Sequence, residues 1–141
     1  MEHKLVDQTV LLRLDVGEEI HESIQKVAEY YNIKTAQVSA IGAVERTTVG
    51  FYDSTSQEYH TIKYDEGLEL TSLQGNISQN NGKYHGHFHI TLSDREGNVY
   101  GGHLIESYIH LTCEIFIRII DTTVERQHEE ATGITRWDLS K

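Results

Sequence analysis

The first part of the chain carries one strand pattern followed by one helix pattern. Apolar residues recur at about every second position in residues 9–16, which predicts a half-buried strand. Apolar side chains then recur at three- and four-residue spacing, at Ile20, Ile24, Val27 and Tyr31. Two glutamates suit the start of this segment, and Asn32 suits a left-handed cap at its end. We therefore predict a helix over residues 18–31, with an apolar stripe that covers a sheet and with His21 on its exposed side.

Strand patterns dominate the rest of the chain. Segments rich in Val, Thr, Ile and aromatic residues cover residues 35–52, 59–64, 68–78 and 109–120. In the last segment, alternation predicts one apolar face made of Ile109, Leu111, Cys113, Ile115, Ile117 and Ile119. Residues 122–133 are polar, and residues 134–139 predict a last short strand.

These elements predict the fold class. One main helix over a mostly antiparallel β-sheet gives a single compact α+β domain. We expect the domain to span residues 1–141, with a core at about residues 9–120 and a C-terminal extension at residues 121–141.

Two turn sequences fix how the central strands pair. Asn81-Gly82 is typical of a two-residue type I′ hairpin, and Arg95-Glu96-Gly97 fits a three-residue loop with a left-handed glycine. The first turn predicts the pairs Asn80 with Lys83, Ser78 with His85, Asn76 with His87, and Gln74 with His89. The second turn places His89 opposite His103. Three adjacent strands therefore share a polar face centred on histidine.

This register brings His87, His89 and His103 within reach of a single ion. Opposed side chains in a sheet have Cβ atoms about 5 Å apart. Three imidazoles with one open position form a typical ligand-accepting zinc site. Asn76 and Gln74 lie where they could fix the orientation of the rings. The sequence therefore predicts a divalent metal site, with zinc as the expected ion.

The same residues also fit other arrangements. His85 is a candidate fourth ligand, although it lies one pleat further along the strand. A hydrated polar face or a contact between subunits would also accommodate the histidines. A bulge at Gly101-Gly102 would turn His103 to the other face, whereas two regular glycines would leave space for a ligand or a neighbouring chain. Glu114 is a candidate general base or orienting acid, with an ordinary surface glutamate as the alternative.

Composition narrows the classes of function. Twelve Lys and Arg against 22 Asp and Glu give a formal net charge of −10, which disfavours sequence-independent binding to phosphate backbones. No apolar run reaches the ~20 residues of a membrane span, and the first residues lack the apolar stretch of a signal peptide. The single cysteine, Cys113, excludes an internal disulfide and is expected to be a buried, inert thiol. We expect a cytoplasmic protein.

Several runs resemble the plants and prokaryotes conserved (PPC) domain family. The longest is Val38-Ser-Ala-Ile-Gly-Ala-Val-Glu-Arg-Thr-Thr-Val-Gly-Phe-Tyr-Asp53, and Leu73-Gln-Gly-Asn-Ile-Ser78, His87-Phe-His89 and Gly101-Gly-His-Leu104 are also similar. The resemblance covers about residues 9–120. It implies a compact α+β fold and a homotrimer. It also matches His87, His89 and His103 to positions that can hold a metal ion, typically zinc, in microbial relatives.

The resemblance carries a DNA-binding description that the residues do not support. In plant relatives the domain is joined to AT-hook peptides, and microbial members are often described as DNA-binding proteins. An AT hook needs a proline flanked by Gly-Arg, whereas this chain contains no proline. The plant pattern Gly-Arg-Phe-Glu, linked to partner contacts, is Gly67-Leu-Glu-Leu70 here, without the arginine.

Three hypotheses follow from these observations. The first is a cytoplasmic homotrimer that binds a metal and serves regulation, or binding of a small ligand or protein partner, rather than catalysis. In this trimer Phe116 and Ile120 would be hidden between subunits. The second is a metal-dependent enzyme with an activated water and Glu114 as its base. The third is a DNA-binding protein, which the net charge disfavours.

Overall fold

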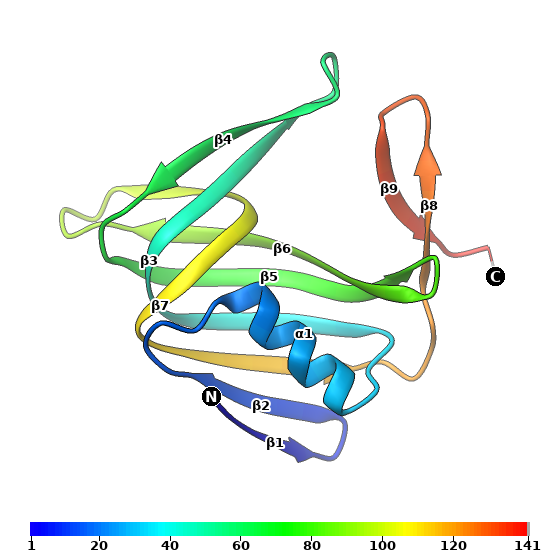
Figure 1. Ribbon diagram of the computed structural model, residues 1–141, viewed down its shortest axis with the longest axis horizontal. Coiled ribbons are helices and arrows are strands. Elements are labelled where there is room, and N and C mark those ends of the chain that lie inside the picture. The colour runs from blue at the N-terminus through cyan, green and yellow to red at the C-terminus, as the bar shows by residue number, and fades with distance from the viewer. Residues whose placement is uncertain (141) are drawn as a thin grey trace.

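The computed structural model describes residues 1–140 and shows one helix against one curved, mixed sheet (Figure 1). The elements in chain order are β1 (Glu2–Val6), β2 (Thr9–Leu14), α1 (Ile20–Tyr30), β3 (Ala36–Asp53), β4 (Glu58–Tyr64), β5 (Leu68–Asn80), β6 (Lys83–Ser93), β7 (Val99–Ile119), β8 (Glu125–Glu129) and β9 (Ile134–Asp138). All strand pairs are antiparallel except β5 with β8, which are parallel. Among residues 1–140, no helix is long and apolar enough to cross a membrane.

The helix is shorter than the predicted range of residues 18–31 because Glu19 caps its N-terminus. The Glu19 carboxylate accepts a hydrogen bond from the backbone N–H of Glu22 at 2.7 Å, which satisfies one free donor of the first turn. Asn32 has the predicted left-handed conformation, with φ of 53°. The helix buries four apolar side chains against the sheet: Ile20, Ile24, Val27 and Ala28.

Two long strands, β3 and β7, bend and close the sheet around the core. Strand β3 pairs with β5 and β7, while β6 pairs with β5 and with the first part of β7. The inner face of this ring holds the largest fully buried side chains, which include Phe88, Leu73, Ile77, Leu92 and Leu104. Burial of each such side chain stabilises the fold by about 1.5–3 kcal/mol. The opposite, outer face of β5, β6 and β7 is therefore left for polar residues.

Both predicted turns are confirmed, and with them the strand register. Asn81 and Gly82 both have positive φ, as a type I′ turn requires. In the second turn the N–H of Gly97 donates to the carbonyl of Asp94, and Gly97 has φ of 81°. The pairs predicted from these turns are all present: Asn80 with Lys83, Ser78 with His85, Asn76 with His87, Gln74 with His89, and His89 with His103.

Two predictions about local structure were wrong. Leu111 is 63% exposed, because the pairing of β3 with β7 shifts register between Gly42 and Val44 and turns this residue outward. His21 is partly buried and lies 3.1 Å from the Leu104 carbonyl oxygen, since the helix rolls this side towards β7. In addition, residues 2–6 and 125–129 form strands that the sequence analysis did not predict, because both segments are largely polar and exposed.

Candidate metal centre

Three imidazoles converge on the outer face of the sheet. His87 and His89 project from β6, and His103 projects from β7 directly opposite His89. One ligand nitrogen from each ring lies within 4.8 Å of the other two. The Nε2 atoms of His87 and His89 are 3.3 Å apart. Two nitrogens bound to the same tetrahedral zinc at ~2.1 Å lie about 3.4 Å apart, so the spacing already suits one ion.

Glycines allow the strands of the site to approach closely. A Cβ at Gly75 of β5 would overlap the backbone oxygen of His87, and a Cβ at Gly101 would overlap that of Ile90. A Cβ at Gly102 would lie 2.8 Å from the Gly50 oxygen. The pairing of Gly101 and Gly102 with β6 is regular, without a bulge, so His103 stays on the same face as His89. These glycines serve close strand packing.

The environment of the cluster keeps two of its imidazoles neutral. Burial, followed by the nearby His103 ring, lowers the pKa of His87 to about 4. Burial, followed by the His89 ring, lowers the pKa of His103 to about 4. Burial, followed by the charge of Arg126, also lowers the pKa of His85. Neutral imidazole is the form that binds a metal, so the donor set fits a divalent cation such as zinc.

The other predicted site residues are placed at different distances from this cluster. Asn76 and Gln74 lie beside it on β5, opposite His87 and His89. His85 lies on the same face but outside the set of converging nitrogens. Glu114 is exposed and pairs with Ile41, on the far half of β7. It is about three strand spacings, roughly 14 Å, from the histidines, and so it is not brought to the site.

The structure adds two residues that the sequence did not indicate. The Tyr59 ring of β4 packs against His103 with 5.0 Å between ring centroids. The Arg126 guanidinium of β8 reaches Asn76 and lies 3.5 Å from Nδ1 of His87. The β3–β4 hairpin had a weak signal, since strand patterns occur on both sides of residues 53–58. No sequence pattern indicated Arg126. Within residues 1–140, its strand β8 pairs with β5 through a single residue pair, Gln79 with Glu125.

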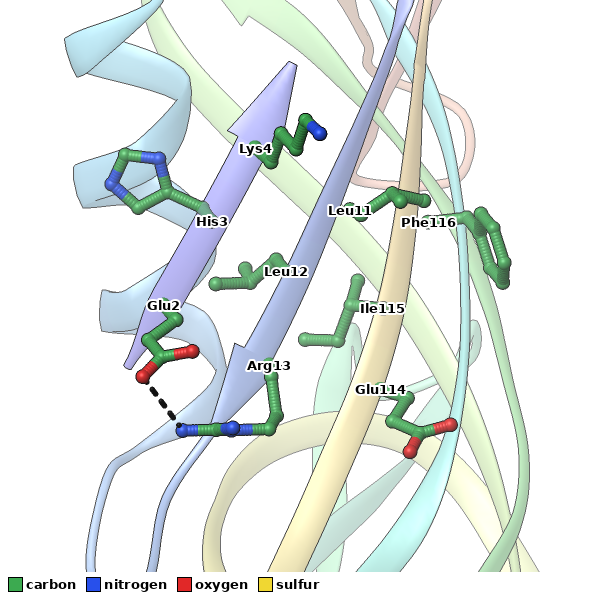
Figure 2. A pocket seen from close by; sticks show the side chains of 9 residues that line it. All are labelled: Glu2, His3, Lys4, Leu11, Leu12, Arg13, Glu114, Ile115 and Phe116. Atoms are coloured by element: carbon green, nitrogen blue, oxygen red, sulfur yellow. Dashed lines mark ion pairs between the residues drawn. The ribbon is translucent and has the colours of Figure 1, made fainter. Parts of the chain in front are cut away.

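A second feature of the outer face is an exposed apolar area on β2, β3 and β7. Leu11 lies directly opposite Phe116 on the neighbouring strand, and both line a groove that also contains Glu114 (Figure 2). Two further grooves extend the area along β3, where Ile41 lies between them. The four large apolar side chains here are 41–63% exposed: Leu11, Ile41, Leu111 and Phe116. Exposed apolar surface of this kind is typical of interaction sites.

Comparison with known proteins identifies the family of this chain. Residues 1–121 match the Plants and Prokaryotes Conserved (PCC) domain, and the chain belongs to this family. The resemblance to the PPC domain seen in the sequence is thereby confirmed.

Solved structures agree with this assignment. The PPC protein of Pyrococcus horikoshii is 31% identical, with a TM-score of 0.87, and the match covers 97% of this chain and 94% of that one. A metal-containing protein of Archaeoglobus fulgidus is 37% identical, with a TM-score of 0.86, and 96% of each chain is covered. A "putative DNA binding protein" of Bacteroides thetaiotaomicron is 21% identical, with a TM-score of 0.96, over 99% of this chain and 98% of that one. At that identity, the last match shows the fold alone.

Curated relatives are much longer than this chain. The bifunctional protein GlmU of Synechococcus sp. (strain JA-3-3Ab) is 27% identical over 133 residues. The match covers 92% of this chain, and this chain spans about a fifth (20%) of that protein's length.

Proposed function

We propose that the chain binds a divalent metal ion, zinc in the first place, through His87, His89 and His103. We further propose that it works in the cytoplasm as a homotrimeric module for regulation or for binding a small ligand or protein partner. The observation that carries the metal proposal is the convergence of three imidazole nitrogens within 4.8 Å on rigid, paired strands. The archaeal relative at 37% identity is itself described as a metal-containing protein.

The three imidazoles are the residues that would hold the ion. A zinc ion with three protein ligands keeps a fourth position for a ligand and polarises an oxygen that binds there. Tyr59 supports the ring of His103 from β4, and Asn76 lies beside His87. We favour binding over hydrolysis because the candidate base, Glu114, lies about 14 Å from the cluster, at three strand spacings.

Elemental analysis tests the metal proposal directly. Tag-free protein is dialysed and its zinc content measured beside a triple variant, His87→Ala/His89→Ala/His103→Ala. A matched control replaces three histidines outside the cluster, His60, His110 and His128. We expect about one ion per chain in the wild type and in the control, and none in the first variant. Equal metal content in all three proteins would refute the site.

The identity of the ion needs a competition experiment. Three imidazoles also accept Ni²⁺ and Cu²⁺, and affinity at a given nitrogen site rises towards Cu²⁺. We expect zinc to be bound after purification from cells grown without added metal, and Cu²⁺ to displace it in vitro. Retention of zinc against excess Cu²⁺ would contradict a simple site with three imidazole ligands.

The exposed apolar area supports the proposed trimer. Phe116 and Ile120 are 54% and 46% exposed in the single chain, and Leu11, Ile41 and Leu111 extend the area. Its burial between subunits would remove this surface from water. Light scattering coupled to size-exclusion chromatography should give a mass near three chains. Phe116→Asp should lower that mass, whereas Val99→Asp, a change at the similarly exposed first residue of β7, should not. A wild-type mass near one chain would end the trimer proposal.

Direct DNA binding is the weaker alternative. Five of the basic side chains already form ion pairs with acidic residues: Arg13, Lys26, Arg46, Arg95 and Arg136. Cationic side chains that neutralise phosphates supply most of the non-specific affinity for DNA. A chain of net charge −10, with these five cations already paired, has little of that affinity left. We expect no retardation of duplex DNA in a gel-shift assay at low salt, and retardation would reverse this order of preference.

A further inference from the structure

The C-terminal hairpin, formed by β8 and β9, carries a guanidinium to the edge of the histidine cluster. Arg126 donates from Nε to Ser78 Oγ at 2.8 Å, from Nη1 to the Thr135 carbonyl at 2.9 Å and from Nη2 to Asn76 Oδ1 at 3.2 Å. Its Nη2 also lies 3.5 Å from Nδ1 of His87. Arg126 thus lies over the same outer face as the three imidazoles, and its neighbours hold it there.

The hairpin is fixed to the sheet at both of its ends. The N–H of Gln79 donates to the Val124 carbonyl at 2.8 Å, where β8 meets β5. At the far end, the Tyr52 hydroxyl donates to the Thr132 carbonyl at 2.7 Å, which joins the β8–β9 turn to the β3–β4 hairpin. Figure 1 shows both hairpins rising on the same side of the sheet. The position of Arg126 is therefore built into the fold.

Among residues 1–140, no carboxylate forms an ion pair with Arg126. Four other arginines form ion pairs with carboxylates, namely Arg13, Arg46, Arg95 and Arg136, and Arg118 is exposed to solvent. Arg126 is partly buried, and within residues 1–140 its hydrogen-bond partners are all neutral groups. A partly buried cation with neutral partners pays a desolvation cost that an anion would offset. An anion would offset still more positive charge if the three imidazoles beside Arg126 held a divalent ion, as proposed above.

The donors of Arg126 point to the same conclusion. A guanidinium has five N–H groups, and three of them donate to Ser78, Thr135 and Asn76. The two that remain are on Nη1 and Nη2, and the one on Nη2 faces His87 Nδ1. When Nε2 of a neutral histidine binds a metal, Nδ1 carries the ring proton and cannot accept a hydrogen bond. Metal binding through His87 Nε2 would therefore leave this donor in need of a new acceptor.

We propose that Arg126 and the metal together form a binding site for a small carboxylate. This inference rests on the proposed metal site and names the class of ligand that the site takes. Carboxylate oxygens bind both zinc and the guanidinium fork. Phosphoryl and sulfonyl oxyanions share this chemistry. A chain of net charge −10 repels a phosphoryl dianion more strongly than a monoanion, and a sulfonate, although a monoanion, is a much weaker base and metal ligand than a carboxylate. A planar carboxylate is also the natural partner of the two N–H groups left on the fork.

Cobalt-loaded protein provides the test, because bound Co²⁺ reports changes in its ligands through its visible spectrum. Acetate is titrated at constant ionic strength, with methylphosphonate and methanesulfonate in parallel arms. We expect a saturable change with acetate in the wild type. Arg126→Met should raise the acetate midpoint about tenfold or more, as expected for a lost hydrogen bond to a charged group. Arg126→Lys, which keeps the charge without the fork, should lie between.

The control is Arg136→Met, which removes an exposed arginine of the same hairpin that pairs with Glu129 instead. It should titrate like the wild type. If Arg126→Met does not fold, Arg126→Lys and ¹³C-acetate binding to wild-type protein with and without zinc decide the matter. Equal acetate midpoints in the wild type and the Arg126 variants, or no acetate response in the wild type, would overturn the inference. Tighter binding of methylphosphonate would overturn its carboxylate class, whereas failure to bind cobalt at all would refute the metal proposal itself.

Discussion

Replacement of Gly75 by alanine tests the strand packing on which the histidine cluster depends. Gly75 lies in β5 between Gln74 and Asn76, directly opposite Phe88 of β6. A Cβ at this position would overlap the backbone oxygen of His87 and would lie 2.6 Å from Cδ1 and 2.8 Å from Cα of Phe88. Two of these three contacts are to backbone atoms, so rotation of a side chain cannot relieve them. β6 must therefore move away from β5.

The magnitude follows from the cost of overpacking a close-packed core. Phe88 is fully buried, and an inserted methyl group that shifts its backbone costs about 1–3 kcal/mol. For a chain of this size, 1 kcal/mol changes Tm by about 3–4 °C. We therefore expect Gly75→Ala to melt about 3–12 °C below the wild type. Because β6 carries His87 and His89, metal affinity should fall as well.

Thermal unfolding followed by circular dichroism gives the first quantity, in the presence of a chelator and at equal protein concentration. These conditions remove stabilisation by metal and by mass action. The control is Gln74→Ala on the same strand, whose side chain is exposed and donates a long hydrogen bond to Ser72 Oγ at 3.4 Å. It should change stability by less than about 0.5 kcal/mol. A Gly75→Ala protein that melts within 1 °C of the wild type, where this reasoning gives about 3 °C or more, would show that the strands are not packed as described.

Three further outcomes are expected. Burial raises the pKa of Cys113 to about 12, so a thiol reagent at pH 8 should react with the denatured chain but not with the native one; rapid labelling of native protein would contradict this. Hydrogen bonds from Asn98 and then Tyr100 lower the pKa of Asp94 to about 2, so its ionised form stabilises the fold above the unfolded value of 3.8. The stability advantage of wild type over Asp94→Asn should therefore shrink as pH falls from about 4 towards 2, as denaturant titrations at each pH would show, and a constant difference would count against it. Glu19→Ala should lower the free energy of unfolding in urea by about 1 kcal/mol, because the Glu19 carboxylate accepts hydrogen bonds from the N–H groups of Glu22 at 2.7 Å and Ser107 at 3.2 Å; an unchanged urea midpoint would exclude this capping role.

The part of the site that the sequence predicted depends on local turn chemistry. Asn81-Gly82 and Gly97 each require positive φ, and a hairpin closed by such a turn has only one register in keeping with its hydrophobic face. From these two turns the positions opposite His87, His89 and His103 follow by counting. No knowledge of the remaining fold was needed, because each step involves strands adjacent along the chain.

The errors occur where pairing partners are distant in sequence. Alternation placed Leu111 on the buried face and left Glu114 near the histidines, because both predictions assume that residues 109–120 form a regular strand without a register shift. In the structure β7 shifts register against β3 near Gly42, and its pairing partner changes from β6 to β2 along its length. Such shifts depend on contacts between residues about 70 positions apart, such as Gly42 with Cys113, and no local pattern records them.

Arg126 is the clearest case of a residue that no local sequence pattern places near the cluster. The three histidines lie on strands within residues 1–121, which match the family, whereas the C-terminal hairpin lies beyond that range. Its approach to the cluster depends on one parallel residue pair and on the contact between Tyr52 and Thr132. The three proposed metal ligands thus lie in the β5–β7 meander, and Arg126 beside them lies in a separate segment. Substitutions in the hairpin should therefore alter which ligand joins the metal without altering whether the metal binds.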